Sequence, residues 1–428
     1  MVYGAEMYSW MKDLFPLNRS LSGEGNRKTL KYLRDLVPNM KISEFKSGYP
    51  AFDWIIPHEW NVENAFIERS DGSRVAEFSN CNLHLVGYSI PIDKIVKKEE
   101  LLKHIHYVDE MPNAIPYVTS YYENDWGFCI SKQEFEKLGD GPFRVYIDSS
   151  LKGSSEGGVV NYGEVVLKGR SSQEILFSTY ICHPSMANNE LSGPALSVAL
   201  IKEIANIDHH YTYRFLFLPE TIGSIAYLSE NYERMKNKTI AGWVLTCIGD
   251  KGNFSYIPSR QGNNYADRIT KEVLSVKAPE YIAYSWLDRG SDERQFCSPG
   301  IDLPVCGITR SKYDTYPEYH TNLDNLGIIS EKSLEESLEV LSHIVKKIES
   351  QRVPKSTILC EPQMGRRNLY SNLSTRQSYS NQTRKIMDVL SYLDGSHTLE
   401  DVSKKCGIEL TQVNEILEIL LAHEIVEI

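Results

Sequence analysis

The sequence lacks any apolar run of the about 18 residues that a membrane-spanning helix requires. Its mean hydropathy is -0.35. The first residues also lack the basic segment followed by an apolar stretch that marks a secretory signal. We therefore expect a protein that makes no contact with a membrane and lies in the cytoplasm.

Cysteine pairs and excess positive charge are absent as well. The eight cysteines form no CxxC motif and mostly lie in apolar stretches, which is typical of reduced thiols rather than of a disulfide framework. The 46 Lys and Arg residues face 57 Asp and Glu residues, so the net charge is -11. Because nucleic-acid binding depends on a basic surface, we expect no nucleic-acid partner.

The 428 residues exceed the about 250–300 that one core usually holds, which predicts two or three domains. Strand-like and helical segments alternate over 151–358, and this pattern predicts an α/β fold: a mainly parallel sheet with helices on both faces. Residues 1–42 look helical, with Ser22 as a helix N-cap, and we assign them to the same domain. Residues 43–150 contain short alternating stretches broken by Pro, Gly, Asn and Asp, which predicts an inserted β-rich domain.

The C-terminal part has a different composition. Residues 361–382 are polar and resemble a linker, and 381–428 hold three helical stretches and a short strand, which predicts a winged-helix module. That module has four Lys or Arg against nine Asp or Glu, and its expected recognition helix carries Glu415 and Glu418 without a cation. Because this surface would repel phosphates, we expect the module to pack against protein. One such partner would be a second copy of the chain, which would make a homo-oligomer.

Polar clusters follow several expected strands, and each contains candidate site residues: His183 with Asn189 and Glu190, Glu220, Asp292, and His320 with Tyr316, Tyr319 and Asp324. In α/β sheets, functional groups gather beyond the carboxyl ends of strands. Taken singly, each residue has an ordinary structural explanation, such as a loop histidine bonded to backbone or a carboxylate at a helix start. Taken together, histidine and carboxylate ligands at one edge predict a catalytic zinc site.

Two other features have competing explanations. Cys182 precedes His183 and suggests a nucleophile pair, but adjacent side chains on an extended chain point to opposite faces, so we expect Cys182 to be an apolar filler. Several aromatic residues of the insertion either roof the pocket or fill the insertion's own core, and their density favours the core. They are Trp54, Trp60, Tyr117, Tyr121, Tyr122 and Trp126.

Six stretches between residues 19 and 325 resemble a bacterial aminopeptidase-like family associated with polysaccharide biosynthesis, which is related to zinc aminopeptidases and glutaminyl cyclases. They are RSLSGEGNRKTL, FDWIIPHEWNVENAFI, IPYVTSYYENDWGFCIS, CHPSMANNELSG, PETIGSIAYL and YHTNLDN. The resemblance implies a phosphorylase/hydrolase-like α/β domain with an inserted β domain and a C-terminal winged helix.

The resemblance also assigns roles. It places His183 at the first metal histidine and His320 at the last. Glu220 falls at the glutamate pair that supplies a metal ligand and the general base, and Asp292 falls in the catalytic hydrogen-bond network. Glu190 is the acid nearest to the position of the residue that bridges two metal ions in the family. The resemblance therefore allows Glu190 to act as a metal ligand or as the general base.

This sequence departs from the family pattern at four positions: Ser185, Asn189 and Thr221 stand where acidic residues are expected, and Asp250 lies just beyond the position of a fourth. These departures imply one zinc ion, held by His183, His320 and either Glu220 or Glu190, rather than two.

The function implied is a zinc metallopeptidase or amidohydrolase. Its substrate would be a peptide or a small molecule with an aminoacyl or N-acyl group on a sugar, and the bond cleaved would be an amide. The alternative from another class is an inactive protein that binds a metal or a glycan and keeps the aminopeptidase fold, because acids are missing at Asn189 and Thr221.

Overall fold

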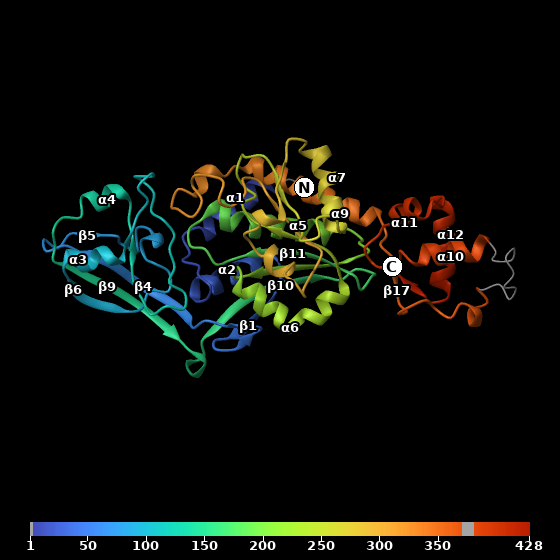
Figure 1. The fold of residues 1–428 in the computed structure, drawn as a ribbon. Coiled ribbons are helices and arrows are strands. Elements are labelled where there is room, and N and C mark those ends of the chain that lie inside the picture. The colour runs from blue at the N-terminus through green and yellow to red at the C-terminus, as the bar shows by residue number, and fades with distance from the viewer. Residues whose placement is uncertain (1–2, 370–380) are drawn as a thin grey trace.

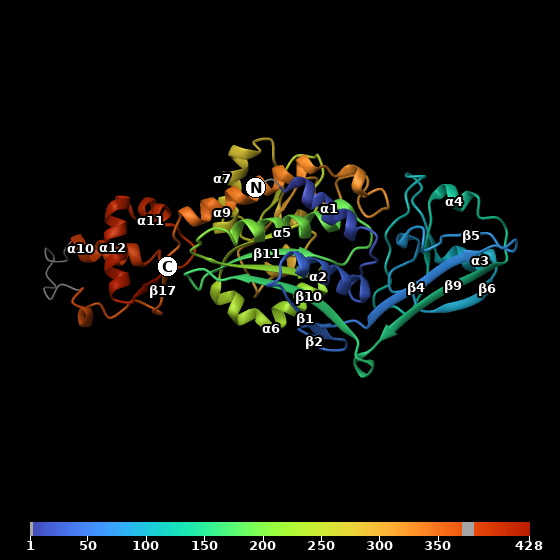
Figure 2. The same ribbon diagram turned by 180° about the vertical axis from the view of Figure 1, so that it is seen from behind.

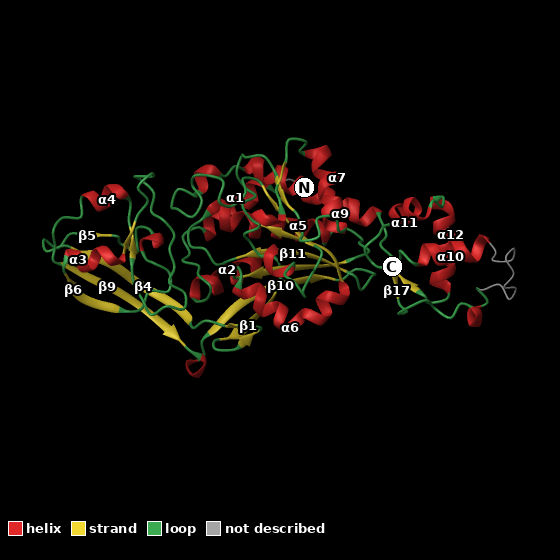
Figure 3. Cartoon of the chain, in the orientation of Figure 1, coloured by secondary structure: helices red, strands yellow, loops and turns green. Residues whose placement is uncertain are grey.

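The computed structural model describes residues 3–369 and 381–428 and forms three lobes in a row (Figure 1). An α/β lobe lies in the middle, a β-rich lobe built around β4 and β9 lies on one side, and a helical lobe lies on the other; the view from behind shows the same order (Figure 2). The inserted lobe consists mostly of strands and loops, the α/β lobe combines strands with helices, and the C-terminal lobe is mostly helical (Figure 3). The expected fold class, an α/β sheet with an inserted β-rich part and a winged helix, is confirmed.

The central sheet has eight strands in the order β1-β10-β12-β11-β13-β16-β14-β15. The pairs β12–β11, β11–β13 and β13–β16 are parallel, whereas β1–β10, β10–β12 and β14–β16 are antiparallel. The strands are β1 (Lys41–Lys46), β10 (Val159–Leu167), β11 (Glu174–Tyr180), β12 (Thr212–Leu218), β13 (Thr239–Leu245), β14 (Ser255–Ile257), β15 (Ile282–Ala283) and β16 (Val305–Thr309). The mainly parallel centre matches the prediction, and the antiparallel pairs lie toward its edges.

Helices cover both faces because side chains of each central strand alternate between two hydrophobic clusters. Phe177 of β11 packs in the first cluster, and its neighbour Leu176 packs in the second. The first cluster lies under α1 (Gly4–Leu14), α2 (Glu24–Leu36), α5 (Ser192–Ile204), α7 (Tyr265–Lys277) and α9 (Glu331–Ser350); the second lies under α6 (Ile222–Lys238) and α8 (Glu293–Phe296). Short 3-10 turns η5 (Trp286–Asp288) and η6 (Leu326–Ile328) complete the lobe.

Helix α5 lies very close to the sheet at Gly193. A Cβ atom there would lie 2.2 Å from Oγ1 of Thr179 and 2.4 Å from the carbonyl oxygen of Leu245. Only glycine permits this approach, which brings the start of α5 against β11 and β13.

The inserted lobe is a four-stranded antiparallel sheet in the order β5-β4-β9-β6, with two small two-stranded sheets. Its elements are β2 (Pro50–Ala51), β3 (Trp54–Ile55), β4 (Glu59–Glu68), β5 (Arg74–Val75), η1 (Asn82–His84), β6 (Ile92–Val96), α3 (Lys98–Leu101), η2 (Leu102–His104), β7 (Ile105–His106), β8 (Phe128–Cys129), α4 (Lys132–Glu136), β9 (Phe143–Lys152) and η3 (Ser154–Glu156). Its large side chains join those on the α6 side of the central sheet in one hydrophobic cluster, so the lobe is packed firmly onto the α/β lobe.

The predicted N-cap at Ser22 is wrong. Helix α2 begins after Gly23, whose φ of 97° suits glycine, and no side chain caps it. The Ser22 hydroxyl instead accepts from the backbone N–H of Trp60 at 3.0 Å and bonds the Tyr88 hydroxyl at 2.8 Å. Ser22 therefore joins the chain opening to the inserted lobe.

The C-terminal lobe contains β17 (Lys355–Ser356), η7 (Gly365–Arg367), α10 (Asn381–Leu390), α11 (Leu399–Cys406), α12 (Leu410–Ala422) and β18 (Val426–Glu427). Strand β17 pairs with β18, so the module includes chain upstream of residue 381. Of the linker expected at 361–382, residues 370–380 lie outside the described part of the chain. Glu415 and Glu418 are exposed on α12, as the sequence pattern indicates.

All eight cysteines are free thiols. Among the helices of 3–369 and 381–428, none combines the length and the apolar character that crossing a bilayer would demand.

A charge network ties the antiparallel edge to the parallel centre. Arg214 of β12 donates two hydrogen bonds of 2.8 Å to Glu174 of β11 and one of 2.5 Å to Glu164 of β10. Arg234 of α6 reaches Glu174 at 2.9 Å. Burial raises the pKa of Glu174, but the hydrogen bonds and charges of Arg214 and Arg234 outweigh this and lower it. The network therefore stabilises the fold above the unfolded-state pKa of a glutamate, and this stability is lost as the pH falls through the lower folded-state pKa.

We expect Arg214→Met to lower the free energy of unfolding by about 3 kcal/mol at neutral pH, because it leaves a buried carboxylate short of its main partner. Urea denaturation measures this. Arg170→Met is the matched control, since Arg170 faces Asp208 in an exposed pair and should change stability by less than about 0.5 kcal/mol. Equal effects of the two substitutions would contradict the role of the network.

Candidate functional site

Four of the predicted site residues gather beyond the carboxyl ends of neighbouring strands. His183 follows β11 and Glu220 follows β12, while Glu190 lies in one turn of π-helix, η4 (Ala187–Leu191), before α5. The ring centroids of His183 and His320 are 5.2 Å apart. The convergence that the strand order suggests therefore takes place.

His183 is held from one side by a buried carboxylate. Its Nδ1 lies 2.8 Å from Oε2 of Glu190, and its carbonyl oxygen accepts a 3.0 Å hydrogen bond from Nε of Arg19. Arg19 also lies 3.6 Å from Oε1 of Glu190, and both of these side chains are fully buried. Because an ionised carboxylate only accepts, Nδ1 carries the hydrogen and Nε2 of the neutral ring keeps its lone pair.

The Nε2 side of His183 faces Glu220, with 3.8 Å between Nε2 and Oε2. Burial lowers the pKa of His183, but the hydrogen bond that His183 donates to Glu190 and the charges of Glu190 and Glu220 raise it overall. Burial raises the pKa of Glu220 to about 7, with His183 opposing the rise and Asp292 adding to it. A carboxyl group with this pKa exchanges protons readily at neutral pH.

His320 presents a nitrogen without a partner. Its Nε2 is buried and makes no hydrogen bond within the described residues. Burial, helped by the charge of His183, lowers the pKa of His320 to about 3, so the ring is neutral. The ring stacks on Tyr319, with centroids 3.9 Å apart. A buried, neutral imidazole with an unused lone pair has the properties of a metal ligand.

Asp292 supports the turn that presents Glu220. Its Oδ1 accepts hydrogen bonds of 2.8 Å from the backbone N–H of Thr221 and the hydroxyl of Ser224, whereas Oδ2 is buried without a partner. Burial raises the pKa of Asp292 to about 6. The predicted hydrogen-bond role thus appears as backbone support for the residue after Glu220.

Asp324 organises the π-helical turn from the other side. It accepts hydrogen bonds from the backbone N–H groups of Asn188 at 2.6 Å and Asn189 at 2.9 Å, and from the Tyr316 hydroxyl at 2.9 Å. Tyr316 is therefore engaged in supporting the turn that carries Glu190. Single π-helical turns inside or beside α-helices often accompany functional sites.

The acids expected for a second metal are absent or engaged elsewhere. The amide oxygen of Asn189 accepts a 2.9 Å hydrogen bond from the Tyr180 hydroxyl. Asp250 accepts from the side-chain nitrogen of Asn188 at 3.2 Å and from the backbone of Gly252 at 3.0 Å.

Backbone strain is concentrated around the site. Non-glycine residues with positive φ include Ser185 (41°), Thr221 (64°), Cys247 (48°) and His320 (54°). Thr221 is β-branched, for which this region is strongly disfavoured. Such conformations cost about 1–3 kcal/mol each and persist where surrounding contacts impose them, commonly at functional sites.

The reasoning that separated Cys182 from His183 is wrong. Sγ of Cys182 lies 3.5 Å from Nδ1 of His183, because β11 ends at Tyr180 and the alternation of an extended chain no longer applies. Cys182, His183 and Glu190 form the one group of at least three close ligand atoms within 3–369 and 381–428. Burial raises the pKa of the Cys182 thiol well above its usual value, which disfavours a thiolate nucleophile, as predicted.

The inserted lobe contributes to the site through one loop. The backbone N–H of Tyr117 donates to the carbonyl of His320 at 2.8 Å, and Ile115 and Asn322 exchange two further hydrogen bonds. The Tyr117 ring lies 5.2 Å from that of His183 and 5.3 Å from that of His320. Tyr117 was one of the aromatic residues that the sequence analysis considered for the pocket roof, whereas Arg19 was missed as a site residue although it lies in a stretch that carries the family resemblance.

Some aromatic residues of the insertion fill its core and others line the pocket, so each of the two explanations holds in part. Trp60 and Trp126 are buried in the core, as predicted, whereas Trp54 is 41% exposed and Tyr122 is 54% exposed. Those two, with Tyr121, line a cavity of about 310 Å³ that also contains Glu220. The aromatic residues therefore both fill the core and wall the pocket.

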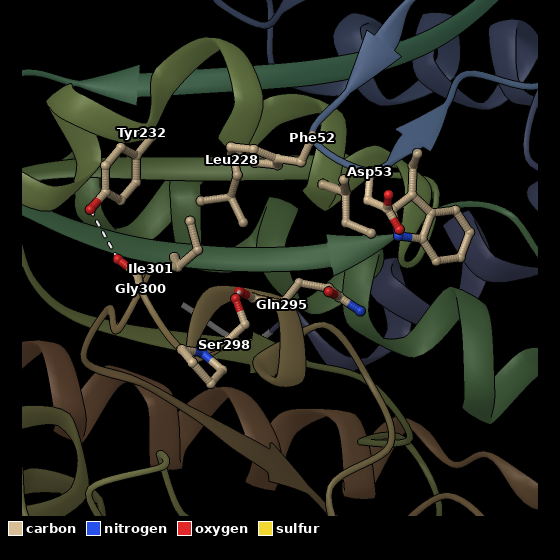
Figure 4. A pocket seen from close by; sticks show the side chains of 11 residues that line it. Phe52, Asp53, Leu228, Tyr232, Gln295, Ser298, Gly300 and Ile301 are labelled. Atoms are coloured by element: carbon tan, nitrogen blue, oxygen red, sulfur yellow. Dashed lines mark hydrogen bonds between the residues drawn. The ribbon is translucent and has the colours of Figure 1, made fainter.

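This cavity adjoins a larger groove of about 470 Å³, and Trp54 and Gln295 line both. Figure 4 shows the groove, with Phe52 and Leu228 on one side and Ile301 and Ser298 on the other. The Tyr232 hydroxyl donates to the carbonyl of Gly300 at 2.9 Å across one end. The mainly apolar groove gives the pocket an extension for a substrate larger than the cavity itself.

Two family models match the chain. The model of a domain of unknown function (DUF4910) matches residues 8–351, and a winged helix-turn-helix model matches residues 352–428. A protein of Clostridium acetobutylicum named "Putative polysaccharide biosynthesis protein with aminopeptidase-like domain" is 39% identical over 430 residues, which covers 99% of this chain and 96% of that protein.

Solved structures agree with these matches. The crystal structure of a "putative peptidase" from Clostridium acetobutylicum is similar with a TM-score of 0.79 at 38% identity, covering 99% of this chain and 96% of that one. A zinc aminopeptidase from Bacillus subtilis shares the fold alone, with a TM-score of 0.60 at 13% identity over 81% of this chain and 95% of that one. The resemblance found in the sequence is thereby confirmed, and the chain belongs to the DUF4910 family of aminopeptidase-like proteins.

Proposed function

We propose that this protein is a zinc-dependent hydrolase that cleaves an amide bond in a peptide or in an aminoacyl or N-acyl sugar. The observation that carries the proposal is the arrangement at the end of the sheet. Buried His183 and half-buried His320 lie side by side, one oriented by a carboxylate and the other with an unused buried nitrogen, and a carboxyl group of raised pKa faces His183. The family relative linked by name to polysaccharide biosynthesis supports the sugar class of substrate.

The residues present fit one zinc ion. Nε2 of His183, His320 and the carboxylate of Glu220 would hold it, and Glu190 would orient His183 through Nδ1, the common second partner of a metal-binding histidine. The set of Cys182, His183 Nδ1 and Glu190 fits a hydrolase less well, because all three side chains are buried and a catalytic zinc needs an open position. A zinc ion supplies Lewis acidity toward the scissile carbonyl and acidifies water.

The chain's own groups supply the proton transfers. Glu220 lines the pocket and faces His183, and a carboxylate oxygen that the metal leaves free can take a proton from water and pass it to the leaving amine. Asp292 keeps the backbone after Glu220 in place. Tyr117 packs against both histidine rings and Tyr319 stacks on His320, which limits the orientations that the two rings can take.

A second candidate is a metal-binding protein without hydrolytic activity. One observation favours it: the position expected for the second glutamate of the catalytic pair is Thr221, whose hydroxyl accepts a hydrogen bond from Arg294 at 2.7 Å. Metal content alone does not separate the two candidates, whereas turnover does.

Metal content is the first test. We expect close to one zinc ion per wild-type chain purified without chelator, and loss of it in His183→Ala and His320→Ala, because each removes a nitrogen ligand. Inductively coupled plasma mass spectrometry measures this. His343→Ala is the matched control, since His343 lies on α9, its Nδ1 bonds the carbonyl of Glu339, and it lines a hollow that contains none of the proposed site residues. Absence of zinc in the wild type, even after zinc is supplied, would overturn the proposal.

Cys182→Ser separates the two metal arrangements. We expect it to retain zinc within about twofold of the wild type, because binding through Nε2 of His183 does not use the thiol. Loss of zinc in this variant, with the fold intact by circular dichroism, would instead identify Cys182 as a ligand.

Glu220→Gln tests the catalytic step. We expect turnover of an amide substrate to fall by about 10²–10⁴-fold, since an amide cannot accept the proton. Zinc should remain, because the histidines are untouched and an amide oxygen replaces the carboxylate oxygen. A panel of aminoacyl and N-acyl sugar amides, assayed for released amine, provides the readout. A wild-type protein that holds zinc but hydrolyses no amide in such a panel would favour the inactive metal-binding protein.

A further inference from the structure

Arg294 is the one cationic side chain among the residues that line the pocket beside Glu220. Its Nη2 donates a 2.7 Å hydrogen bond to Oγ1 of Thr221, whereas its Nε is buried and has no hydrogen-bond partner. Within 3–369 and 381–428, no carboxylate lies within 4.0 Å of its guanidinium nitrogens. An arginine offers five N–H donors in a planar fork, so most of its binding capacity here is unused.

Arg294 supplies positive charge close to two acids of the site. Burial dominates the raised pKa values of Glu220 and Asp292, and the charge of Arg294 opposes the rise in both without forming an ion pair with either. Helix α6 starts in the same wall at Ile222 and has no acidic residue in its first turn. Its N-terminal dipole adds positive potential at that point.

We propose that Arg294 binds a carboxylate group of the substrate, next to the bond that faces Glu220. The hydrogen bond to Thr221 fixes the plane of the guanidinium, and the remaining N–H groups are available for two parallel bonds to a carboxylate. The identity of the scissile bond rests on the proposed function, but the carboxylate binding does not.

One negative charge suits this pocket better than two. A single arginine lies near Glu220 and Asp292, and a phosphate of charge about -1.5 to -2 would need further cations. The substrate class is therefore an amide that carries a carboxylate close to the bond cleaved. The carboxylate comes either from an amino acid or from a uronic acid sugar.

Binding of small probes to the full chain, both zinc-loaded and chelator-treated, tests this directly. Isothermal titration calorimetry would compare N-acetylleucine with N-acetylleucinamide, and glucuronic acid with glucose. We expect the acid of at least one pair to bind about ten- to a hundredfold more tightly than its neutral partner, and Arg294→Gln to remove that difference. Arg294→Lys should retain part of it, since it keeps the charge but loses the fork.

The matched control is Arg289→Gln, because Arg289 lies just before helix α8, which carries Arg294, is exposed, and among described residues its side chain bonds only the nearby carbonyl of Trp286. It should leave the preference for acids unchanged. Thermal unfolding of each variant verifies the fold, and Arg294→Lys keeps the test valid where Arg294→Gln does not fold.

The outcomes separate this inference from the proposed function. Equal binding of acid and neutral probes by the wild type, or a preference that survives in Arg294→Gln, overturns the carboxylate role. Preference without any amide hydrolysis leaves the inference standing while the proposed hydrolysis fails. Where hydrolysis occurs, Arg294→Gln should raise KM for the acidic substrate and leave kcat nearly unchanged. A fall in kcat for acidic and neutral substrates alike would overturn the inference. It would identify Arg294 as a stabiliser of the reacting carbonyl oxygen.

Discussion

The contact of Glu190 with both Arg19 and His183 is the interaction on which the site depends. Glu190 and Arg19 are fully buried, and neither charge could be buried without the other, since an isolated buried charge costs several kcal/mol. Arg19 comes from the chain opening, whereas Glu190 and His183 follow β11. The pair therefore joins segments far apart in sequence and, by binding Nδ1, turns Nε2 of His183 toward Glu220.

The same principle applies around the pocket, where buried polar groups fix loops that no hydrophobic contact would hold in one conformation. Asp324 accepts three backbone N–H groups of the turn at residues 187–189, and Asp292 accepts one from Thr221. The Asp292 contact helps to hold Thr221 at its positive φ. The site is thus preorganised by carboxylates that do not themselves reach the pocket, which is consistent with catalysis that relies on fixed electrostatics.

Much of the architecture could be predicted because it depends on local patterns. The apolar runs of the central strands and the polar residue after each of them locate His183 and Glu220 at one edge, and the resemblance adds His320. The role of Glu190 could not be predicted. The sequence reveals neither that Arg19, so far from it along the chain, contacts it, nor which nitrogen of His183 it contacts. The error over Cys182 has a similar cause: a rule for extended chain was applied one or two residues after the strand had ended. The aromatic insertion was only partly predicted, because the same residue types serve as core and as pocket wall.

The substitutions at the expected acidic positions argue for one metal ion and one bound anion rather than for a damaged two-metal centre. Asn189 is saturated by Tyr180, and Thr221 by Arg294, so each neutral side chain has a defined partner. Neither substitution leaves its own side chain without a hydrogen-bond partner. Arg294 brings a positive charge to the side of the pocket where the family pattern has a second glutamate. Replacing an acid with a neutral group and adding a cation both make the local charge more positive. Both changes therefore favour a substrate that carries a negative charge.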